Sequence, residues 1–267
     1  MTIERLKKIL KCSKEHEINI NNYIKSFSHQ VDFENIDGVR ELLQIVRPVL
    51  QQKNYKIIEL PLVDKEIGAF IYRGDKLSYL VINSSVPVVN ANFALCHELF
   101  HIFFQPNTNK NTADIEFDYF ENDSEEIANL FAGNLLMPKD SFSKLFNKFA
   151  TICNGDEIDI IVSLMNYFKA PFMAVFIRCY ELGLFTKNTV DDHFFNIKSS
   201  ELENRFEKFW YDSSILRPSN NDDSERLKKM VHDYGTEYVQ NEYIKQKTLT
   251  EVMKNLDLLL KKIKASN

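Results

Sequence analysis

The sequence lacks paired cysteines. Its four cysteines are scattered along 267 residues and none forms a Cys-x-x-Cys pair, so neither a cysteine-based zinc site nor a disulfide framework is indicated. No apolar run approaches the roughly 18 residues of a membrane span, and the first residues lack the apolar core of a secretion signal. We therefore expect a soluble, cytoplasmic protein with no membrane partner.

A basic surface is also missing. Lys and Arg number 33 against 38 Asp and Glu, which gives a formal net charge of −5. Broad binding to a phosphate backbone needs a basic surface, so direct binding to nucleic acid is not expected, whereas binding to a DNA-binding protein stays open. Hydrophobic residues make up 44% of the chain, enough for a sizeable core, which excludes a disordered chain.

The order of the predicted elements indicates an α+β fold. Helical spacing dominates the first 54 residues, and strand signals follow at residues 56–60, 68–73 and 76–83. The last two flank Gly74 and Asp75, which is typical of a hairpin. Helical patterns continue to the end, so we expect a small antiparallel sheet packed on one apolar helix, followed by a mainly helical C-terminal region.

These patterns divide the chain into four parts, with a linker expected near residues 213–223 and an amphipathic helix near residues 249–263. The parts are an N-terminal helical segment (1–54), a core with the sheet and the apolar helix (55–150), a helix-turn-helix-like pair packed on that core (151–190) and a helical C-terminal region (191–267).

The apolar segment 94–104 contains the motif His-Glu-x-x-His, at His97, Glu98 and His101. Helical positions four apart are rotated by only about 40°, so both imidazoles face the same side and can bind one Zn²⁺. Glu98 is turned about 100° from His97 and can act as a general base toward water beside the metal. Polar groups in an apolar helix are costly unless paired or metal-bound, which favours a metal site over chance.

A catalytic zinc site needs a third protein ligand and an open fourth position. No third histidine follows at the metzincin spacing, so a carboxylate is expected. Asp123 and Glu126 fit a capping box, which leaves Glu125 free as the third ligand, with Glu121, Glu126 or another carboxylate as alternatives. Asn129 shares a helix face with Glu125 and either orients Glu125 or a histidine, or is a surface amide. Mn²⁺ or Fe²⁺ can occupy the same ligands as zinc.

Residues 93–101 and 125–138 together resemble the ImmA/IrrE family of zinc metallopeptidases, which pairs a histidine–glutamate helix with a downstream E-x-x-A-N-x-F-A…L-L-M-P element. The resemblance covers roughly residues 56–186. It implies a zincin-type helix, with His97, His101 and Glu125 as metal ligands and Glu98 as catalytic base. It also implies cleavage of a helix-turn-helix repressor, often encoded beside the protease on a mobile element or in a stress operon.

Two residues depart from the family pattern. Phe100 stands where the family usually has glycine, and we expect it to narrow the cleft. Cys96 stands where a small residue such as alanine is common, and we expect it to be part of the core. Neither change removes a ligand.

The sequence defines the peptide-docking edge and the oxyanion donor less closely than the metal ligands. A bound peptide is expected to add as a strand to the sheet edge, at residues 78–83. An oxyanion needs a further donor. Four residues are chemically able to supply it, and the role stays open among them: Arg178, Tyr119, Tyr180 and His193.

A second hypothesis is a non-catalytic, metal-containing regulator that binds a repressor or DNA. Residues 160–168 and 172–182 resemble a helix-turn-helix pair. The second of these helices is mostly apolar, however, with Arg178 as its only base, whereas a recognition helix offers several polar groups to base edges. We therefore expect this helix to pack into the core.

Overall fold

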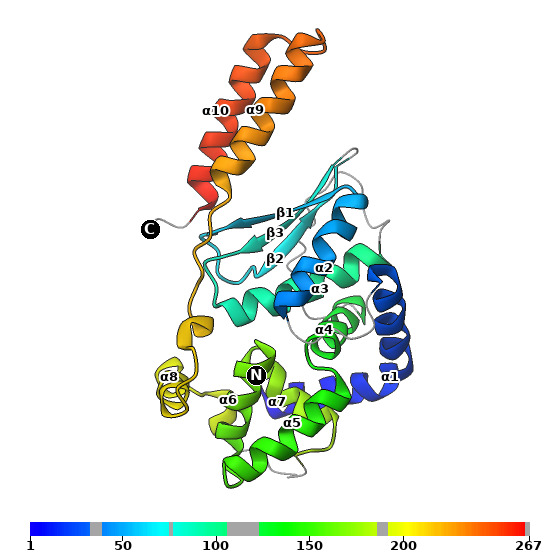
Figure 1. Ribbon diagram of the computed structural model, residues 1–267, viewed down its shortest axis with the longest axis vertical. Coiled ribbons are helices and arrows are strands. Elements are labelled where there is room, and N and C mark those ends of the chain that lie inside the picture. The colour runs from blue at the N-terminus through cyan, green and yellow to red at the C-terminus, as the bar shows by residue number, and fades with distance from the viewer. Residues whose placement is uncertain (33–38, 75–76, 106–122, 186–191, 265–267) are drawn as a thin grey trace.

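The computed structural model describes residues 1–32, 39–74, 77–105, 123–185 and 192–264. A three-stranded sheet lies against a group of helices, and a helical hairpin projects from the sheet (Figure 1), which confirms the predicted α+β class. The elements, in chain order, are α1 (Ile3–Val31), α2 (Val39–Gln52), β1 (Tyr55–Leu60), β2 (Ala69–Tyr72), β3 (Ser78–Asn83), α3 (Val88–Phe104), α4 (Asp123–Leu136), α5 (Lys139–Ile152), α6 (Glu157–Phe168), α7 (Phe172–Glu181), η1 (Asp192–Phe195), α8 (Ser199–Lys208), η2 (Ser213–Leu216), α9 (Ser224–Gln240) and α10 (Gln246–Ile263).

The sheet has the strand order β1–β3–β2 and is mixed. β2 pairs antiparallel with β3, which confirms the predicted hairpin strands, although residues 75–76 of the turn lie outside the described residues. The prediction of a wholly antiparallel sheet is wrong, because β1 pairs parallel with β3. After β1 the chain crosses to the opposite edge of the sheet and forms β2. It then turns back and forms β3 between the two strands, in the same direction as β1.

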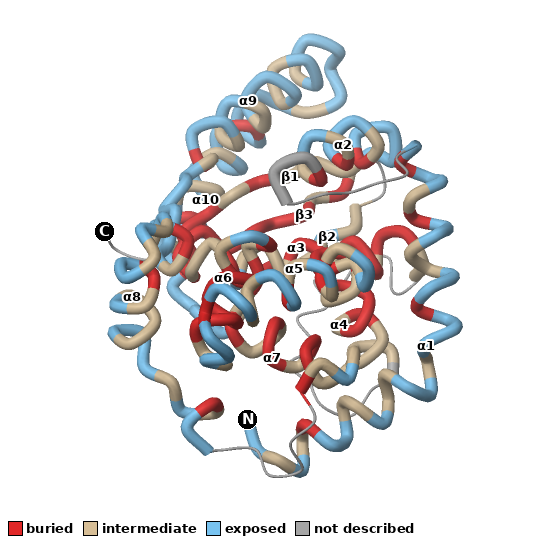
Figure 2. Tube along the Cα trace, turned by 60° about the horizontal axis from the view of Figure 1, so that its bottom comes forward, coloured by how far each residue is buried: buried red, intermediate tan, exposed pale blue. Residues whose placement is uncertain are grey.

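The two faces of β3 contribute to different cores. Leu80 and Ile82 belong to the main core, which also includes the buried residues of α3 and α4. Val81 points to the opposite face and joins a smaller core with Leu260 of α10. This alternation follows from the two-residue period of a strand. The buried residues in Figure 2 accordingly run through β3, α3 and the helices below the sheet.

Phe100 and Cys96 both lie in the core. Phe100 is 2% exposed, and its ring centroid is 5.2 Å from Tyr23 of α1 and 5.6 Å from Phe131 of α4. The prediction that Phe100 narrows the cleft is therefore wrong, because the helical rotation directs its ring toward α1 and α4. Cys96 is fully buried, and burial raises the pKa of its thiol, so its predicted place in the core is confirmed.

α6 and α7 meet at 108° and pack into the main core. The apolar side of α7 is buried, and Arg178 is only 5% exposed, which confirms the core-packing interpretation of this helix. Among the described helices, none by itself has both the length and the apolar composition needed to cross a membrane. α6 and α7 meet these length and composition requirements only when taken together. Both helices contribute many buried residues to the core.

The segment that joins α8 to α9 follows the end of the sheet. The backbone N–H of Glu59 donates to the Asp223 carboxylate at 2.9 Å, and the N–H of Asn220 donates to the carbonyl oxygen of Ser84, also at 2.9 Å. α9 and α10 then form the projecting hairpin (Figure 1). Leu249 and Leu260 are buried on α10, as expected for the predicted amphipathic helix.

Asn83, at the end of β3, joins the loop between β1 and β2 to the loop that follows β3. Its Oδ1 accepts hydrogen bonds from the N–H groups of Leu62 and Ser85, and its Nδ2 donates to the carbonyl oxygens of Asp64 and Ile67. All four bonds are 2.7–3.0 Å long, and the Asn83 side chain is fully buried. The loop that leads into β2 is thereby tied to β3.

We expect Asn83→Ala to lower the free energy of unfolding by about 2–4 kcal/mol, because it leaves buried backbone groups without partners. Urea denaturation would measure the change. Asn147→Ala, at an exposed position on α5, is the matched control and should change stability by less than about 0.5 kcal/mol. Equal midpoints for the two variants would contradict this role for Asn83.

Candidate metal centre

The structure brings His97, His101 and Glu125 together. His97 Nε2 lies 3.0 Å from Glu125 Oε2, His101 Nε2 lies 3.3 Å from Glu125 Oε1, and the two Nε2 atoms are 3.1 Å apart. The histidines lie one turn apart on α3, and Glu125 comes from the first turn of α4. The fully buried Ala128 and Ala132 allow α4 to approach its neighbours closely.

Each histidine ring is held at its other nitrogen by an amide. His97 Nδ1 is 3.0 Å from Asn129 Oδ1, and His101 Nδ1 is 2.8 Å from Gln105 Oε1. The Gln105 amide nitrogen donates to Ser124 Oγ, which fixes the orientation of that amide. An amide oxygen can only accept a hydrogen bond, so the Nδ1–H group of each ring is the donor and Nε2 is directed toward Glu125.

This arrangement fits a divalent cation. The lone pairs of two Nε2 atoms and a carboxylate converge on one small region, with all ligand atoms within 4.8 Å of one another. Such a set of acceptors is repulsive unless a proton or a cation lies among them. Two imidazole nitrogens and one carboxylate oxygen are a ligand set that zinc takes in catalytic sites.

The local electrostatics separate the two glutamates. Burial raises the pKa of Glu98, against the opposing effect of His97 and His101. Burial also acts to raise the pKa of Glu125, but hydrogen bonds with His101 and His97 outweigh it and hold that pKa well below its usual range. Glu125 is therefore ionised, as a ligand must be, whereas the raised pKa of Glu98 makes its carboxylate a better proton acceptor.

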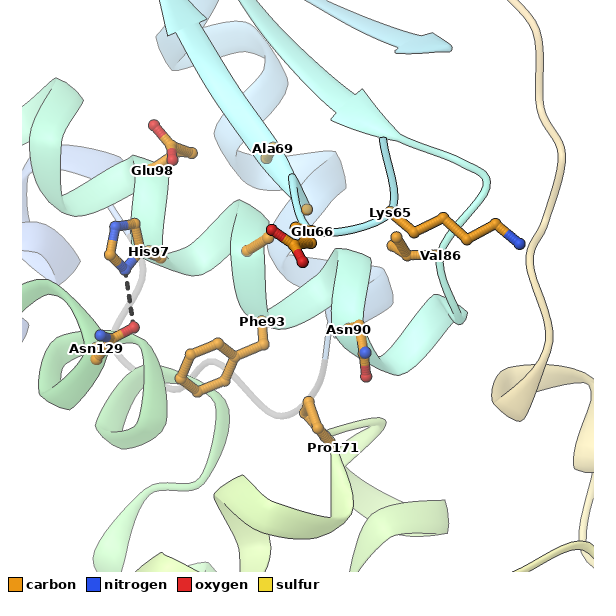
Figure 3. A pocket seen from close by; sticks show the side chains of 12 residues that line it. Lys65, Glu66, Ala69, Val86, Asn90, Phe93, His97, Glu98, Asn129 and Pro171 are labelled. Atoms are coloured by element: carbon orange, nitrogen blue, oxygen red, sulfur yellow. Dashed lines mark hydrogen bonds between the residues drawn. The ribbon is translucent and has the colours of Figure 1, made fainter. Parts of the chain in front are cut away.

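Glu98 faces a cleft of about 280 Å³ between α3 and the segment that leads into β2 (Figure 3). Gly68 and Ala69 form the strand side of this cleft. A Cβ atom on Gly68 would lie 2.6 Å from the Cβ of Ala94, so only glycine permits this close approach of strand and helix.

Arg73 and Gln105 are part of this centre, and the sequence analysis missed both. Arg73 Nη2 donates to the carbonyl oxygens of His101 and Gln105, at 3.1 and 3.3 Å, and joins the end of β2 to the end of α3. Gln105 follows His101 by four residues, and this helical spacing was a usable signal. The place of Arg73 depends on how β2 packs, for which the sequence offered no signal.

The structure describes one of the two named alternatives for the third ligand, Glu126, and places it away from the histidines. Glu126 accepts hydrogen bonds from Arg5 at 3.3 Å and Lys8 at 3.1 Å, both from α1, so its carboxylate is directed away from the histidines. The proposed capping partner of Glu126, the Asp123 side chain, lies outside the described residues, as does Glu121. Of the alternatives that the structure describes, Glu125 is the one beside the histidines.

The three described candidates for oxyanion stabilisation make contacts with residues outside the centre. Arg178 donates to the carbonyl oxygen of Met137 and to Glu181, and His193 pairs with Glu201. The Tyr180 ring packs on Phe176. Tyr119 lies outside the described residues. The oxyanion role therefore has no assigned residue.

The class of protein follows from these observations. A histidine pair on one helix, a carboxylate from the next and a second carboxylate beside them are compatible with a metallopeptidase centre. Residues 50–180 match the family model of the IrrE N-terminal-like domain, Peptidase_M78. The match covers just under half of the chain and confirms the resemblance to the ImmA/IrrE family. No curated protein and no solved structure shows significant similarity to the chain.

We expect Asn129→Ala to weaken zinc binding about 10- to 100-fold, because the His97 ring loses the partner that orients it. Competition with a chromogenic chelator would measure the affinity. Asn134→Ala is the control, since Asn134 lies on the same helix and donates to the carbonyl oxygen of Leu130. Unchanged affinity in Asn129→Ala would contradict the orienting role.

Proposed function

We propose that the protein is a zinc-dependent endopeptidase in which His97, His101 and Glu125 hold the metal and Glu98 is the general base. The observation that carries this proposal is the convergence of the two Nε2 atoms and the Glu125 carboxylate within a segment of the M78 family. Membership of a metallopeptidase family supports the reaction class, and the donor set supports zinc, with Mn²⁺ or Fe²⁺ as alternatives.

In the proposed mechanism the protein side chains position and move protons. A zinc ion at this centre would supply a Lewis acid and lower the pKa of water. Glu98 would accept a proton from the attacking water and deliver it to the leaving nitrogen. Its raised pKa suits this exchange, and the amides of Asn129 and Gln105 would keep the rings in place during the reaction.

The substrate backbone would add to β2. The predicted docking edge at residues 78–83 is wrong, because β3 is the central strand. β2 is an edge strand that pairs with β3 alone in the described sheet, and the segment entering it forms the wall of the cleft opposite Glu98. An extended peptide paired with β2 would pass its carbonyl groups over the candidate centre.

We propose a helix-turn-helix transcriptional repressor as the substrate, following the implication of the ImmA/IrrE resemblance. This assigns the protein to transcription regulation, in a stress response or on a mobile genetic element. The competing DNA-binding regulator is less well supported, because α7 lies in the core and its Arg178 is engaged with Met137 and Glu181.

The test is direct cleavage. The zinc-loaded protein is incubated with the repressor encoded beside its own gene, with and without a chelator, and the products are identified by mass spectrometry. One or a few defined fragments that disappear with the chelator would support the proposal. An intact repressor, together with a gel shift of operator DNA at low salt, would favour the regulator instead.

A further inference from the structure

A second cavity, of about 450 Å³, lies beside the candidate centre and is lined mainly by α1, α4 and α7, with Phe93 of α3 and Pro171 completing its wall. Each helix contributes one face, since the lining residues recur at helical spacing. α1 supplies Ile9 and Cys12, and α7 supplies Ala174 and Ile177. The floor comes from the face of α4 that carries Asn129, Leu130 and Gly133.

The chemistry of this cavity selects an uncharged, apolar occupant. The charged groups on its walls are paired with one another. Arg5 pairs with Glu126 at 3.3 Å, and Arg178 pairs with Glu181 at 2.9 Å. A charged side chain that entered would lose its hydration without a complementary charge to replace it. A leucine, methionine or phenylalanine side chain would instead bury apolar surface.

The cavity adjoins the cleft at the candidate centre. Phe93, Asn129 and Pro171 line both spaces. Figure 3 shows the Asn129 side chain hydrogen-bonded to His97, with Phe93 next to them and Pro171 farther from His97. Asn129 is also the residue that holds the His97 ring. A peptide bound across the candidate centre would therefore place one of its side chains beside the cavity.

α1 forms one wall of the cavity yet lies outside the family segment, residues 50–180. It is attached to α4 by the hydrogen bonds from Arg5 and Lys8 to Glu126. We propose that α1, α4 and α7 form a specificity subsite that takes a bulky apolar side chain next to the scissile bond. This inference rests on the proposed peptidase function and assigns a role to the N-terminal helix.

Gly133→Leu tests the subsite by filling it. A Cβ atom at Gly133 meets nothing within 4 Å, and leucine is a better helix former than glycine, so this variant should fold. Wild type and variant are given a tryptic peptide library from a cell extract, and the cleaved bonds are read by mass spectrometry. Wild type should prefer leucine, methionine or phenylalanine at one position beside the bond, and Gly133→Leu should reduce that preference over alanine about tenfold or more.

Asn147→Leu is the matched control, since it adds the same side chain at an exposed position on α5, outside the cavity. It should keep the wild-type cleavage profile. An unchanged profile in Gly133→Leu would overturn the proposal.

A second test measures the chemical modification of a cysteine and does not depend on cleavage. It therefore distinguishes a failure of the subsite from a failure of the peptidase proposal. Cys12 is half-buried in the cavity wall, whereas the other three cysteines are buried. N-ethylmaleimide should therefore modify Cys12 first. N-acetyl-phenylalaninamide should slow this reaction more than N-acetyl-alaninamide, and Gly133→Leu should abolish the difference. Equal protection by the two amides in wild type would overturn the subsite even if no peptide is cleaved.

Discussion

Replacing Glu98 with glutamine is expected to reduce kcat/KM for repressor cleavage by about 100- to 10,000-fold, the contribution typical of a general base. Glutamine has nearly the same shape but cannot accept the proton of the attacking water. Zinc content should stay near that of wild type, because Glu98 lies outside the group formed by His97, His101 and Glu125. Stopped cleavage assays and metal analysis of the same preparation would measure both effects.

The role of Glu98 is tested by cleavage activity and zinc content together. Loss of both metal and cleavage would make Glu98 a ligand or a structural residue. Full cleavage by Glu98→Gln would remove it from the mechanism altogether.

Replacing Glu125 with glutamine is expected to weaken zinc binding by more than about 100-fold, beyond the loss typical of an outer partner. The neutral amide removes the charge that the structure places against both histidines. Isothermal titration with zinc would measure the affinity.

Glu126→Gln is the matched control for this prediction. Glu126 is the next residue on α4, but its carboxylate pairs with Arg5 and Lys8 of α1. Its replacement should leave zinc affinity within a few-fold of wild type. Equal losses in both variants would show that the charge of α4, rather than a ligand at Glu125, governs the affinity.

Local patterns were sufficient to predict which residues approach one another at the centre. His97 and His101 are one helical turn apart, so their common direction follows from helix geometry alone. Glu125 could be expected because a capping box of Asp123 and Glu126 leaves it free, and because Ala128 and Ala132 let its helix approach another closely. The contact of Asn129 with His97 was one of the outcomes expected from its place one turn after Glu125.

Long-range packing accounts for what the sequence did not predict. The parallel pairing of β1 with β3 depends on how the chain crosses the sheet, which strand periodicity does not encode. The docking edge was wrongly predicted at residues 78–83 for the same reason, because the strand order could not be predicted. Phe100 was expected to narrow the cleft because it replaces a glycine of the family pattern. Its actual partners, Tyr23 and Phe131, come from other helices, and local spacing does not predict such contacts.

Crystals of the zinc-loaded protein, measured on both sides of the zinc absorption edge, would test the central claim most directly. The account predicts one strong anomalous peak between His97 Nε2, His101 Nε2 and the Glu125 carboxylate, with the Glu98 carboxylate next to it but outside bonding distance. A zinc-loaded crystal without a peak at that point, or with Glu125 turned away from the metal, would contradict it.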